Sequence, residues 1–396
     1  MIVANEAKGI RRTLESNSAG LFTAPALAPS TGYAVTVTKE GFATWEARDL
    51  EILVGQDINL NVTLSVAATA TAVEVTSAAP IVEHTKTGVS QVVEGAQIQD
   101  LPINGRRVDS FVLLTPAVVP DGTYGLLSFR GISGGNAFLT DGNDTTQQFF
   151  NENAGRTRIT AQVSQDAVQE FQVLTNGYSA EFGRASGGVV NTVTRSGSNR
   201  LRGTAYWFFR NQDFNATDRY STINAPETRH QAGASLGGPV RRDKLFYFFN
   251  AEVTRRDFPM VGSLTRPPLF DSSGKFVGTC QTGPGRATPE QCAAALKIFD
   301  RHFQVLERTA NQELGFGKLD WRPVERHSLS LSFNYLRWLS PNGIQTQAVR
   351  NDGAAVGGNG DSTVRARYGR LSWMSILSPA KLNEFRFGWF KDRQYE

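Results

Sequence analysis

Two groups of residues in this sequence have types that could do enzymatic chemistry. Gly131-Ile132-Ser133-Gly134-Gly135 matches the G-x-S-x-G pattern of a nucleophile elbow, in which a strand precedes the serine and a helix follows it. The next stretch, Asn136-Ala137-Phe138-Leu139, has the character of another strand, so we do not expect a nucleophilic serine. The histidines lack the spacing of metal ligands; they are His84, His230, His302 and His327. No phosphate-binding or dinucleotide fingerprint occurs, so the sequence predicts neither an enzyme nor a cofactor.

The two cysteines are a further reactive pair. Cys280 and Cys292 are the only cysteines, and both lie in a loop-like stretch. A disulfide that closes this loop is expected in an oxidising compartment, while two free thiols are the alternative.

Charge and hydropathy exclude two broad classes of protein. The 41 basic and 37 acidic residues leave a formal charge of +4, and the arginines are scattered along the chain. A nucleic-acid-binding protein usually gathers its positive charge on one face, so no nucleic acid is expected as a partner. No apolar run approaches the roughly 18 residues of a membrane-spanning helix. A barrel stays open, because membrane strands are short and alternating.

The first 66 residues predict the short strands of a small β-sandwich. Tyr33, Val35 and Val37 alternate on one face, and a turn follows at Gly41-Phe42. From residue 58 to residue 64 the same period of two continues. Half of such a sandwich is absent, which indicates that the sequence begins inside a longer protein.

The composition changes after this region. No leader peptide is visible in residues 1–20. Residues 67–80 carry small side chains that cannot build a core, which predicts an extended linker. Residues 81–198 mix short strands with glycine-rich turns.

Aromatic-rich strands dominate from about residue 203 onward. Around Gly369 the apolar parity changes, which predicts a β-bulge. The expected strands cover about 203–211, 230–237, 244–256, 314–322, 327–338, 363–377 and 382–392.

Both a soluble sandwich and a membrane barrel would alternate in this way, and three details favour the barrel. The face opposite the apolar one is polar or small, as a wet lumen requires. Short turns such as 323–326 alternate with long stretches such as 257–313 and 340–361. Aromatic residues near strand ends resemble an interface girdle, namely Tyr206, Trp207, Trp321, Trp338 and Trp389. The apolar face would then contact outer-membrane lipid.

The strand count predicts an incomplete barrel. A bacterial single-chain barrel has an even number of strands, and one wide enough to enclose another domain has about 22. Seven strands would leave an unpaired edge in lipid, so we expect the sequence to stop within the barrel.

Ordered motifs carry a resemblance to a known family over about residues 30–260. In chain order they are Ile98–Arg106 (IQDLPINGR), Leu113–Pro116, Phe129–Gly131, Leu139–Gly142, Val168–Val173, Tyr178–Arg184, Gly187–Gly197, Phe209–Asn211 and Leu236–Val240. With these motifs the chain resembles TonB-dependent outer-membrane receptors of the Oar-like branch. In that branch a carboxypeptidase-regulatory-like domain precedes the plug.

The resemblance implies a mainly β protein of the cell outer membrane, with the plug and the N-terminal domain facing the periplasm. The implied parts are a partial carboxypeptidase-regulatory-like β-sandwich (1–66), a linker (67–80), an α+β plug (81–198) and the first strands of an incomplete antiparallel transmembrane β-barrel (199–396).

The linker contains a segment that resembles a TonB box, the strand by which such receptors pair with the inner-membrane protein TonB. The segment consists of Thr71, Ala72, Val73, Glu74, Val75, Thr76, Ser77 and Ala78. Added-strand pairing suits it, because free backbone groups give affinity and alternating valines give specificity. The alternative is an inert linker.

Four charges lie within small-residue segments of the expected plug: Arg130, Glu170, Glu181 and Arg184. In the family such charges pair with the barrel wall and lock the plug, while solvated loop charges are the alternative. Gly183, Gly187 and Gly188 would permit turns and close strand approach. Asp141-Gly142 predicts a tight turn.

The function implied by the resemblance is TonB-energised import of a scarce nutrient, with the plug gating the barrel. A saccharide is the expected cargo, since the front domain resembles carbohydrate-binding sandwiches. The alternative function is a non-transporting outer-membrane protein for adhesion or protein export.

Overall fold

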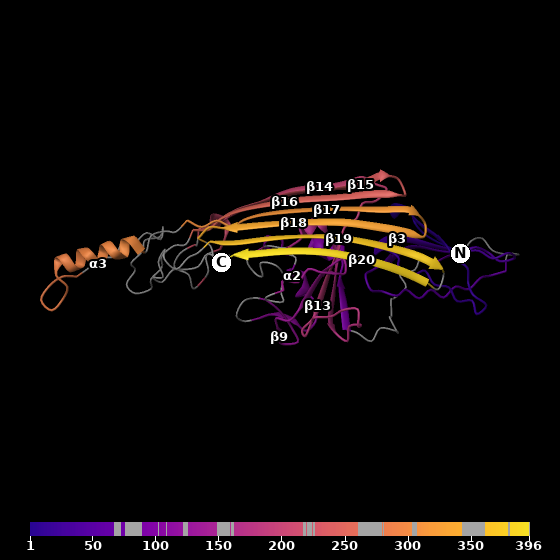
Figure 1. Ribbon diagram of the computed structural model, residues 1–396, viewed down its shortest axis with the longest axis horizontal. Helices are drawn as coiled ribbons and strands as arrows, with labels where there is room; N and C mark the ends of the chain where they lie inside the picture. Colours follow the sequence, from indigo (N-terminus) through magenta and orange to yellow (C-terminus); the bar gives the residue numbers. More distant parts are fainter. Residues whose placement is uncertain are drawn as a thin grey trace.

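The structure, a computed structural model, describes residues 1–66, 73–75, 89–101, 103–107, 109–121, 126–148, 159, 162–216, 219, 224, 226–259, 279, 281–302, 307–342, 361–378 and 381–395. The chain forms an N-terminal sheet, a central domain (described residues within 89–194) and one long antiparallel sheet. The central domain lies against one face of the long sheet, and the N-terminal sheet lies at one end of the long strands (Figure 1).

The N-terminal sheet consists of β1 (Ile2–Asn5), β2 (Ile10–Thr13), β3 (Ser30–Val37), β4 (Trp45–Ile52) and β5 (Val73–Val75), with the 3-10 helix η1 (Glu6–Lys8) after β1. Its strand order is β2-β1-β3-β4-β5, and β5 runs parallel to β4. Tyr33 and Val35 are buried against Trp45, as the alternation predicted. The turn at Gly41-Phe42 is also present, with Gly41 at φ 81°.

The strand expected at 58–64 is absent. The even-numbered side chains Leu60, Val62 and Leu64 do pack on the core of the N-terminal sheet. The backbone from residue 56 to residue 65 joins no strand ladder, apart from the amide of Ala43 that donates to the carbonyl of Ser65 at 2.8 Å. Alternation sets which side chains face the core, but a strand also needs a neighbouring edge to pair with.

The central domain contains a mixed five-stranded sheet, with the order β11-β10-β13-β12-β6, and a three-stranded sheet, β7-β8-β9. Its elements are β6 (Val89–Val93), α1 (Gly95–Asp100), η3 (Asn104–Arg106), α2 (Asp109–Val112), β7 (Val118–Pro120), β8 (Leu127–Phe129), β9 (Ile132–Ser133), β10 (Ala137–Thr140), β11 (Asn143–Asp144), η4 (Gln165–Ala167), β12 (Val168–Asn176) and β13 (Val189–Thr194). Gly188 is required by close packing, because a Cβ there would lie 2.2 Å from the ring of buried Phe129. Gly183 has open space instead.

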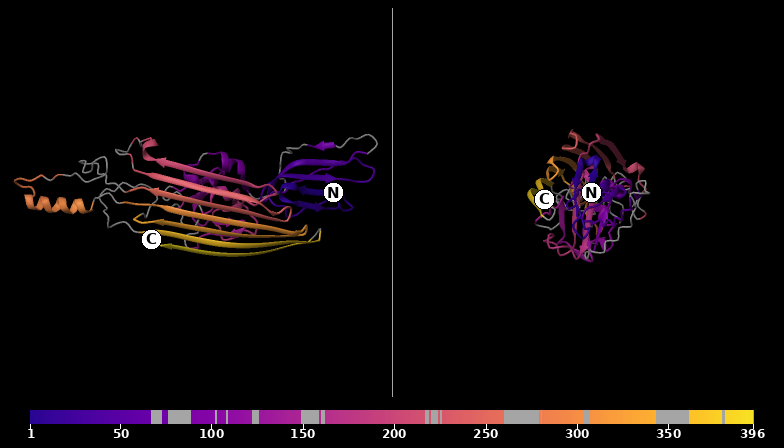
Figure 2. Two further views of the ribbon diagram at one scale, coloured as in Figure 1. Left: turned by 90° about the horizontal axis from the view of Figure 1, so that it is seen from above. Right: turned by 90° about the vertical axis from the view of Figure 1, so that its right-hand side faces the viewer.

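The long sheet contains all seven strands predicted after residue 199, in sequential antiparallel order. They are β14 (Arg202–Asn211), β15 (Thr228–Arg241), β16 (Leu245–Asp257), β17 (Asn311–Val324), β18 (His327–Ser340), β19 (Ser362–Ser378) and β20 (Lys381–Tyr395). Short connections join strands at the end nearest the N-terminal sheet, which we call the short-turn end (Figure 2). The opposite, long-loop end carries η5 (Gln212–Phe214) and α3 (Pro289–His302).

The two faces of the long sheet differ as the sequence predicted. The outer face exposes large apolar side chains such as Trp207, Phe333 and Trp389. The inner face buries polar groups such as Asn250 and Asn334. None of the described helices is long and apolar enough to cross a membrane.

The strands follow an arc over the central domain when seen end-on (Figure 2). Phe248, Phe316 and Tyr368 from the inner face join the main core of the central domain. Alternation with a period of two therefore gives the sheet an outward apolar face and an inward face. The inward face is also partly apolar, where the central domain covers it.

This covered inner face explains three errors of the sequence analysis. The β18–β19 register is continuous through Gly369, so the predicted bulge is wrong: Val364, Ala366 and Tyr368 face inward and are buried against packed side chains. Trp338 is 2% exposed inside the sheet and belongs to no girdle. Tyr206 also points inward, toward Glu252.

Candidate functional site: the interface of the central domain with the long sheet

Asp141 forms the first ionic contact between the central domain and the long sheet. It occupies the turn between β10 and β11 with φ 47°. Its carboxylate accepts hydrogen bonds from the amide (2.9 Å) and hydroxyl (2.7 Å) of Thr194. Lys318 of β17 and Arg370 of β19 lie 3.4 and 3.0 Å from the same carboxylate. A residue predicted to make only a turn therefore also joins two strands of the sheet.

Electrostatics keeps Asp141 charged despite its burial. Desolvation alone would raise its pKa, but Lys318, Arg370 and the Thr194 hydrogen bonds together hold the pKa below its usual value. The side chains of Asp141, Lys318 and Arg370 are 5%, 9% and 12% exposed. Such a contact is sensitive to the loss of one partner, because the remaining charge would be buried without compensation.

Arg106 forms the second contact, between η3 and the inner face of β14 and β16. Its guanidinium lies 2.6 Å from Asp166 and 4.0 Å from Glu252. The guanidinium carbon also lies 4.1 Å from the ring centroid of Tyr206, which is cation–π geometry. Arg106 thus links the central domain to two strands through charge and ring contacts.

Glu252 is the most heavily bonded carboxylate of this second contact. It is 3% exposed on β16 and accepts hydrogen bonds at 2.6 Å from each of Ser164, Tyr206 and Gln231. Ser164 belongs to the central domain, whereas Tyr206 and Gln231 belong to the sheet. Separation of the central domain from the sheet would therefore remove one of the three donors of this buried carboxylate.

The third contact, at the short-turn end, joins the N-terminal domain, the long sheet and the segment that follows β13. Ser196 donates to Asp320 of β17, and Lys8 of η1 donates to the carbonyls of Ser196 (3.3 Å) and Gly197 (3.2 Å). Burial lowers the pKa of Lys8 to about 8, with Asp320 opposing the shift. Arg322 of β17 donates to the carbonyl of Lys8. The N-terminal sheet is therefore attached to the long sheet and to the segment that follows β13.

Of the four predicted lock charges, Glu170 is the most buried, but it faces the N-terminal domain. It accepts a hydrogen bond from the amide of Val54 at 3.0 Å and is 2% exposed. Burial raises its pKa to about 7, the Val54 amide opposes this, and nearby Glu51 and Glu94 add to it. Its structural role is contact with the N-terminal sheet, and a lock with the barrel wall stays a prediction.

The other three predicted charges lie within or at the edge of the central domain. Arg184 pairs with Asp144 at 2.9 Å, with both side chains well exposed. Exposed Arg130 approaches the carbonyl of Gly187 at 3.5 Å. Glu181 accepts from Ser179 and lines the same cavity as residues of β20. The contacts of Arg130 and Arg184 stay within the central domain, whereas Glu181 interacts electrostatically with Arg386 of β20. A lock between these charges and the barrel wall stays a prediction.

The predicted TonB box is described in part. Val73–Val75 form β5, an edge strand whose backbone pairs with Trp45–Ala47 of β4. The residues on either side, Thr71, Ala72, Thr76, Ser77 and Ala78, lie outside the described residues.

The remaining chemical candidates are placed as follows. Ser133 is exposed on the two-residue strand β9, and β10 follows it where an elbow would have a helix. Cys292 is buried in α3 and disulfide-bonded, and Cys280 lies outside the described residues. No group of three metal-ligating side chains occurs within the described part of the chain.

The sequence does hold a signal for part of these contacts. Glu252, Lys318 and Arg370 are charges at inward positions beside neutral inward residues such as Asn250, Phe316 and Ser372. A charge at an inward position requires a buried partner. Asp141 and Arg106 carried no such signal, because turns and loops with charges are usually solvated.

Comparisons with known proteins agree with this arrangement. The model of the outer membrane beta barrel domain matches residues 193–396, and the model of the carboxypeptidase regulatory-like domain matches residues 2–65. A curated relative, the TonB-dependent transporter Oar of Myxococcus xanthus, is 28% identical over 253 residues, which cover 60% of this chain and 23% of that protein.

Solved outer-membrane receptors share the fold. The ferric enterobactin receptor of Pseudomonas aeruginosa matches at TM-score 0.51 and 14% identity, over 79% of this chain and 42% of its own. The siderophore receptor PirA of Acinetobacter baumannii matches at 0.52 and 14%, over 77% and 40%. The outer membrane transporter YddB of Escherichia coli matches at 0.52 and 13%, over 76% and 38%.

The chain thus spans less than half the length of each of these proteins. Its own long sheet, with apolar outer face, short turns at one end and long loops at the other, falls within the matched barrel region. Because that family model covers more than half of the sequence, the chain belongs to the outer membrane β-barrel family and is a protein of the cell outer membrane.

Proposed function

We propose that this chain belongs to a TonB-energised importer in which the central domain is the plug of the barrel. The observation that carries the proposal is the set of buried ionic contacts between the central domain and the inner face of the sheet, from Asp141 to Lys318 and Arg370 and from Arg106 to Glu252. The relation to a TonB-dependent transporter and the receptor-like fold support it. The short-turn end and the N-terminal sheet then face the periplasm.

Ionic contacts suit a plug that must be held and also released. The interface also has an apolar part, where Phe248, Phe316 and Tyr368 join the core of the central domain. Separation exposes these apolar side chains to water, whereas the charged partners regain hydration. Loss of one partner of a buried pair costs about 3–5 kcal/mol because the remaining charge stays buried, whereas joint separation returns both partners to water. In this proposal, work done by an external protein separates the two sides of each contact.

The segment Thr71–Ala78 would receive that work from TonB. Its described residues, Val73–Val75, already form an edge strand, which is the geometry in which a further strand can be added. Tension on this segment would act first on the N-terminal sheet and then on the contacts of Lys8 and Glu170 with the segments around them.

The cargo of this proposal is a scarce nutrient, and a saccharide is one candidate because the N-terminal region matches the carboxypeptidase regulatory-like model. The outer apolar face would contact the lipid of the outer membrane. A surface protein for adhesion or protein export is the competing function, and the same experiment separates the two.

The test uses the full-length gene product in its own host. Deletion of residues 71–78 should abolish energy-dependent uptake while cargo still binds at the cell surface. Photo-crosslinkers placed at Val73 and Val75 should capture TonB, and the same crosslinker at exposed Val66 is the matched control. Unchanged uptake together with no TonB adduct would favour the non-transporting alternative.

A further inference from the structure

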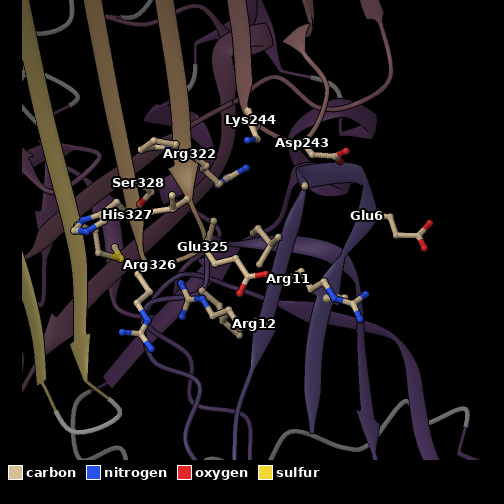
Figure 3. Close-up of a pocket in the computed structure, with 18 of the residues that line it drawn as sticks. Glu6, Arg11, Arg12, Asp243, Lys244, Arg322, Glu325, Arg326, His327 and Ser328 are labelled. Carbon is tan, nitrogen blue, oxygen red and sulfur yellow. The ribbon is translucent and has the colours of Figure 1, made fainter.

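A large cavity lies between the N-terminal sheet and the short-turn end of the long sheet. Its volume is about 1180 Å³. The N-terminal domain contributes residues of η1, β2 and the stretch before β3, and the long sheet contributes the turns around Asp243 and Glu325 (Figure 3). Ligand pockets usually have volumes of roughly 300–1,000 Å³, so this cavity can hold a solute of considerable size.

Positive charge dominates the lining. The seven basic residues are Arg11, Arg12, Arg200, Arg242, Lys244, Arg322 and Arg326, against the three acidic residues Glu6, Asp243 and Glu325. Figure 3 shows Arg12, Arg322 and Arg326 around the same space, with the carboxylate of Glu325 near Arg12 and the carboxylate of Glu6 set to one side. The lining therefore has an excess of four positive charges.

Within the described residues, these cations pair little with anions. Arg12 and Arg322 donate to neutral backbone carbonyls, namely those of Pro25 and Ala26 and that of Lys8. Arg11, Lys244 and Arg326 are exposed, and within the described ranges their side chains make no ion pair or hydrogen bond. Clustered like charges repel one another unless an anion lies between them.

The cavity borders a second one inside the arc of the long sheet. That second cavity, of about 420 Å³, lies beside Asp141 and the inner face of β17–β20. The two share five lining residues, namely Ala28, Pro29, Arg322, Ser328 and Met374. The basic cavity and the space beside the central domain are therefore neighbours with a common wall.

Two sources of anion differ in the side from which they would approach. Ser328 and Met374 have the parity of inward residues such as Asn334 and Ser372, so this part of the lining faces the interior of the arc. A lipid headgroup would approach from the outer face. A soluble anion would approach through the interior or from the periplasm.

We propose that this basic cavity binds a soluble anionic solute that carries two or more phosphate or carboxylate groups. That the bound anion is the transported cargo rests on the proposed import function; binding itself does not. The excess positive charge would draw an anion out of the interior and hold it at the periplasmic exit.

The probe is tripolyphosphate, titrated by calorimetry into the intact protein in a non-ionic detergent at low salt. We expect saturable binding that weakens with added salt. The variant Arg11→Gln/Arg326→Gln should lose about 5- to 10-fold in affinity for each charge removed. Arg11→Lys/Arg326→Lys should keep most of the affinity, because charge and not guanidinium geometry holds the probe.

Lys39→Gln/Arg365→Gln is the matched control, since both side chains are exposed and lie outside the cavity lining. Equal affinities of this control and the Arg11/Arg326 glutamine variant would overturn the proposal. So would loss of tripolyphosphate binding in phosphatidylglycerol nanodiscs but not in phosphatidylcholine nanodiscs, since a lipid headgroup would then be the occupant. None of these measurements needs TonB. The anion-binding proposal can therefore be refuted while TonB-dependent uptake is still observed, and uptake can be refuted while anion binding is still observed.

Discussion

Asp141→Asn tests whether the central domain is held by buried charge. The substitution keeps the shape of the side chain and an oxygen that can accept from the Thr194 amide, but it removes the negative charge. Lys318 and Arg370 would then be buried with side-chain exposures of 9% and 12% and without their anion. Breaking a buried pair from one side costs about 3–5 kcal/mol.

Asp144→Asn is a control in the same loop with the same chemistry. Asp144 also pairs with an arginine at 2.9 Å, but the side chains of Asp144 and Arg184 are 36% and 49% exposed. Exposed pairs contribute about 0–1 kcal/mol. The two substitutions should therefore differ by about 2 kcal/mol or more, although each removes one carboxylate from one ion pair.

The assay is limited proteolysis of the central domain in detergent under conditions of rapid reclosing, where the cleavage rate reports the free energy of local opening. Asp141→Asn should speed cleavage by about 30-fold or more relative to Asp144→Asn, which corresponds to about 2 kcal/mol. Equal cleavage rates would refute the reasoning. A triple variant, Asp141→Asn/Lys318→Met/Arg370→Met, should recover part of the protection, because apolar replacement of a whole buried cluster is often neutral.

Three further predictions follow from other contacts. The pKa of Glu170 is raised from 4.5 to about 7, so between these pH values the native state binds more protons than the unfolded state. The free energy of unfolding should therefore fall by about 3 kcal/mol as pH rises across this range. In denaturant titrations Glu170→Gln should remove this pH dependence and be the more stable form above pH 7, and an equal pH dependence in both proteins would contradict the prediction. Gly188→Ala should destabilise by about 1–3 kcal/mol because its Cβ would overlap Phe129, whereas Gly183→Ala, with open space, should be neutral by thermal unfolding. Brominated lipid should quench the fluorescence of Trp389, which is 45% exposed on the outer face, and should not quench buried Trp338. Trp389→Phe should therefore reduce the quenched fraction of the total tryptophan fluorescence, whereas Trp338→Phe should not.

The seven strands of the long sheet could be predicted from the sequence because their determinants are local. Alternation of side chains fixes the period of a strand, and short polar turns fix where a hairpin reverses. The hairpin between β17 and β18 is an example, since the chain reverses between Val324 and His327, within the short stretch that the sequence marked as a turn. The register of neighbouring strands then follows from these turns.

Alternation alone does not determine what each face meets. Val364, Ala366 and Tyr368 have the opposite parity to Leu371 and Trp373, and this change of apolar parity predicted a bulge at Gly369. In the fold they face inward, because packed side chains of distant segments cover that part of the inner face. The same non-local packing buries Trp338.

The anchoring charges depend even more on distant segments. The sequence by itself determined the strands of the long sheet and its outward apolar face, both of which rest on a period of two. Only the tertiary structure decided that Asp141 and Arg106, and not Arg130 or Arg184, contact the long sheet. The physical reason is that a carboxylate in a turn is solvated or buried according to what the fold brings against it, and its partners Lys318 and Arg370 lie more than 170 residues away in the chain.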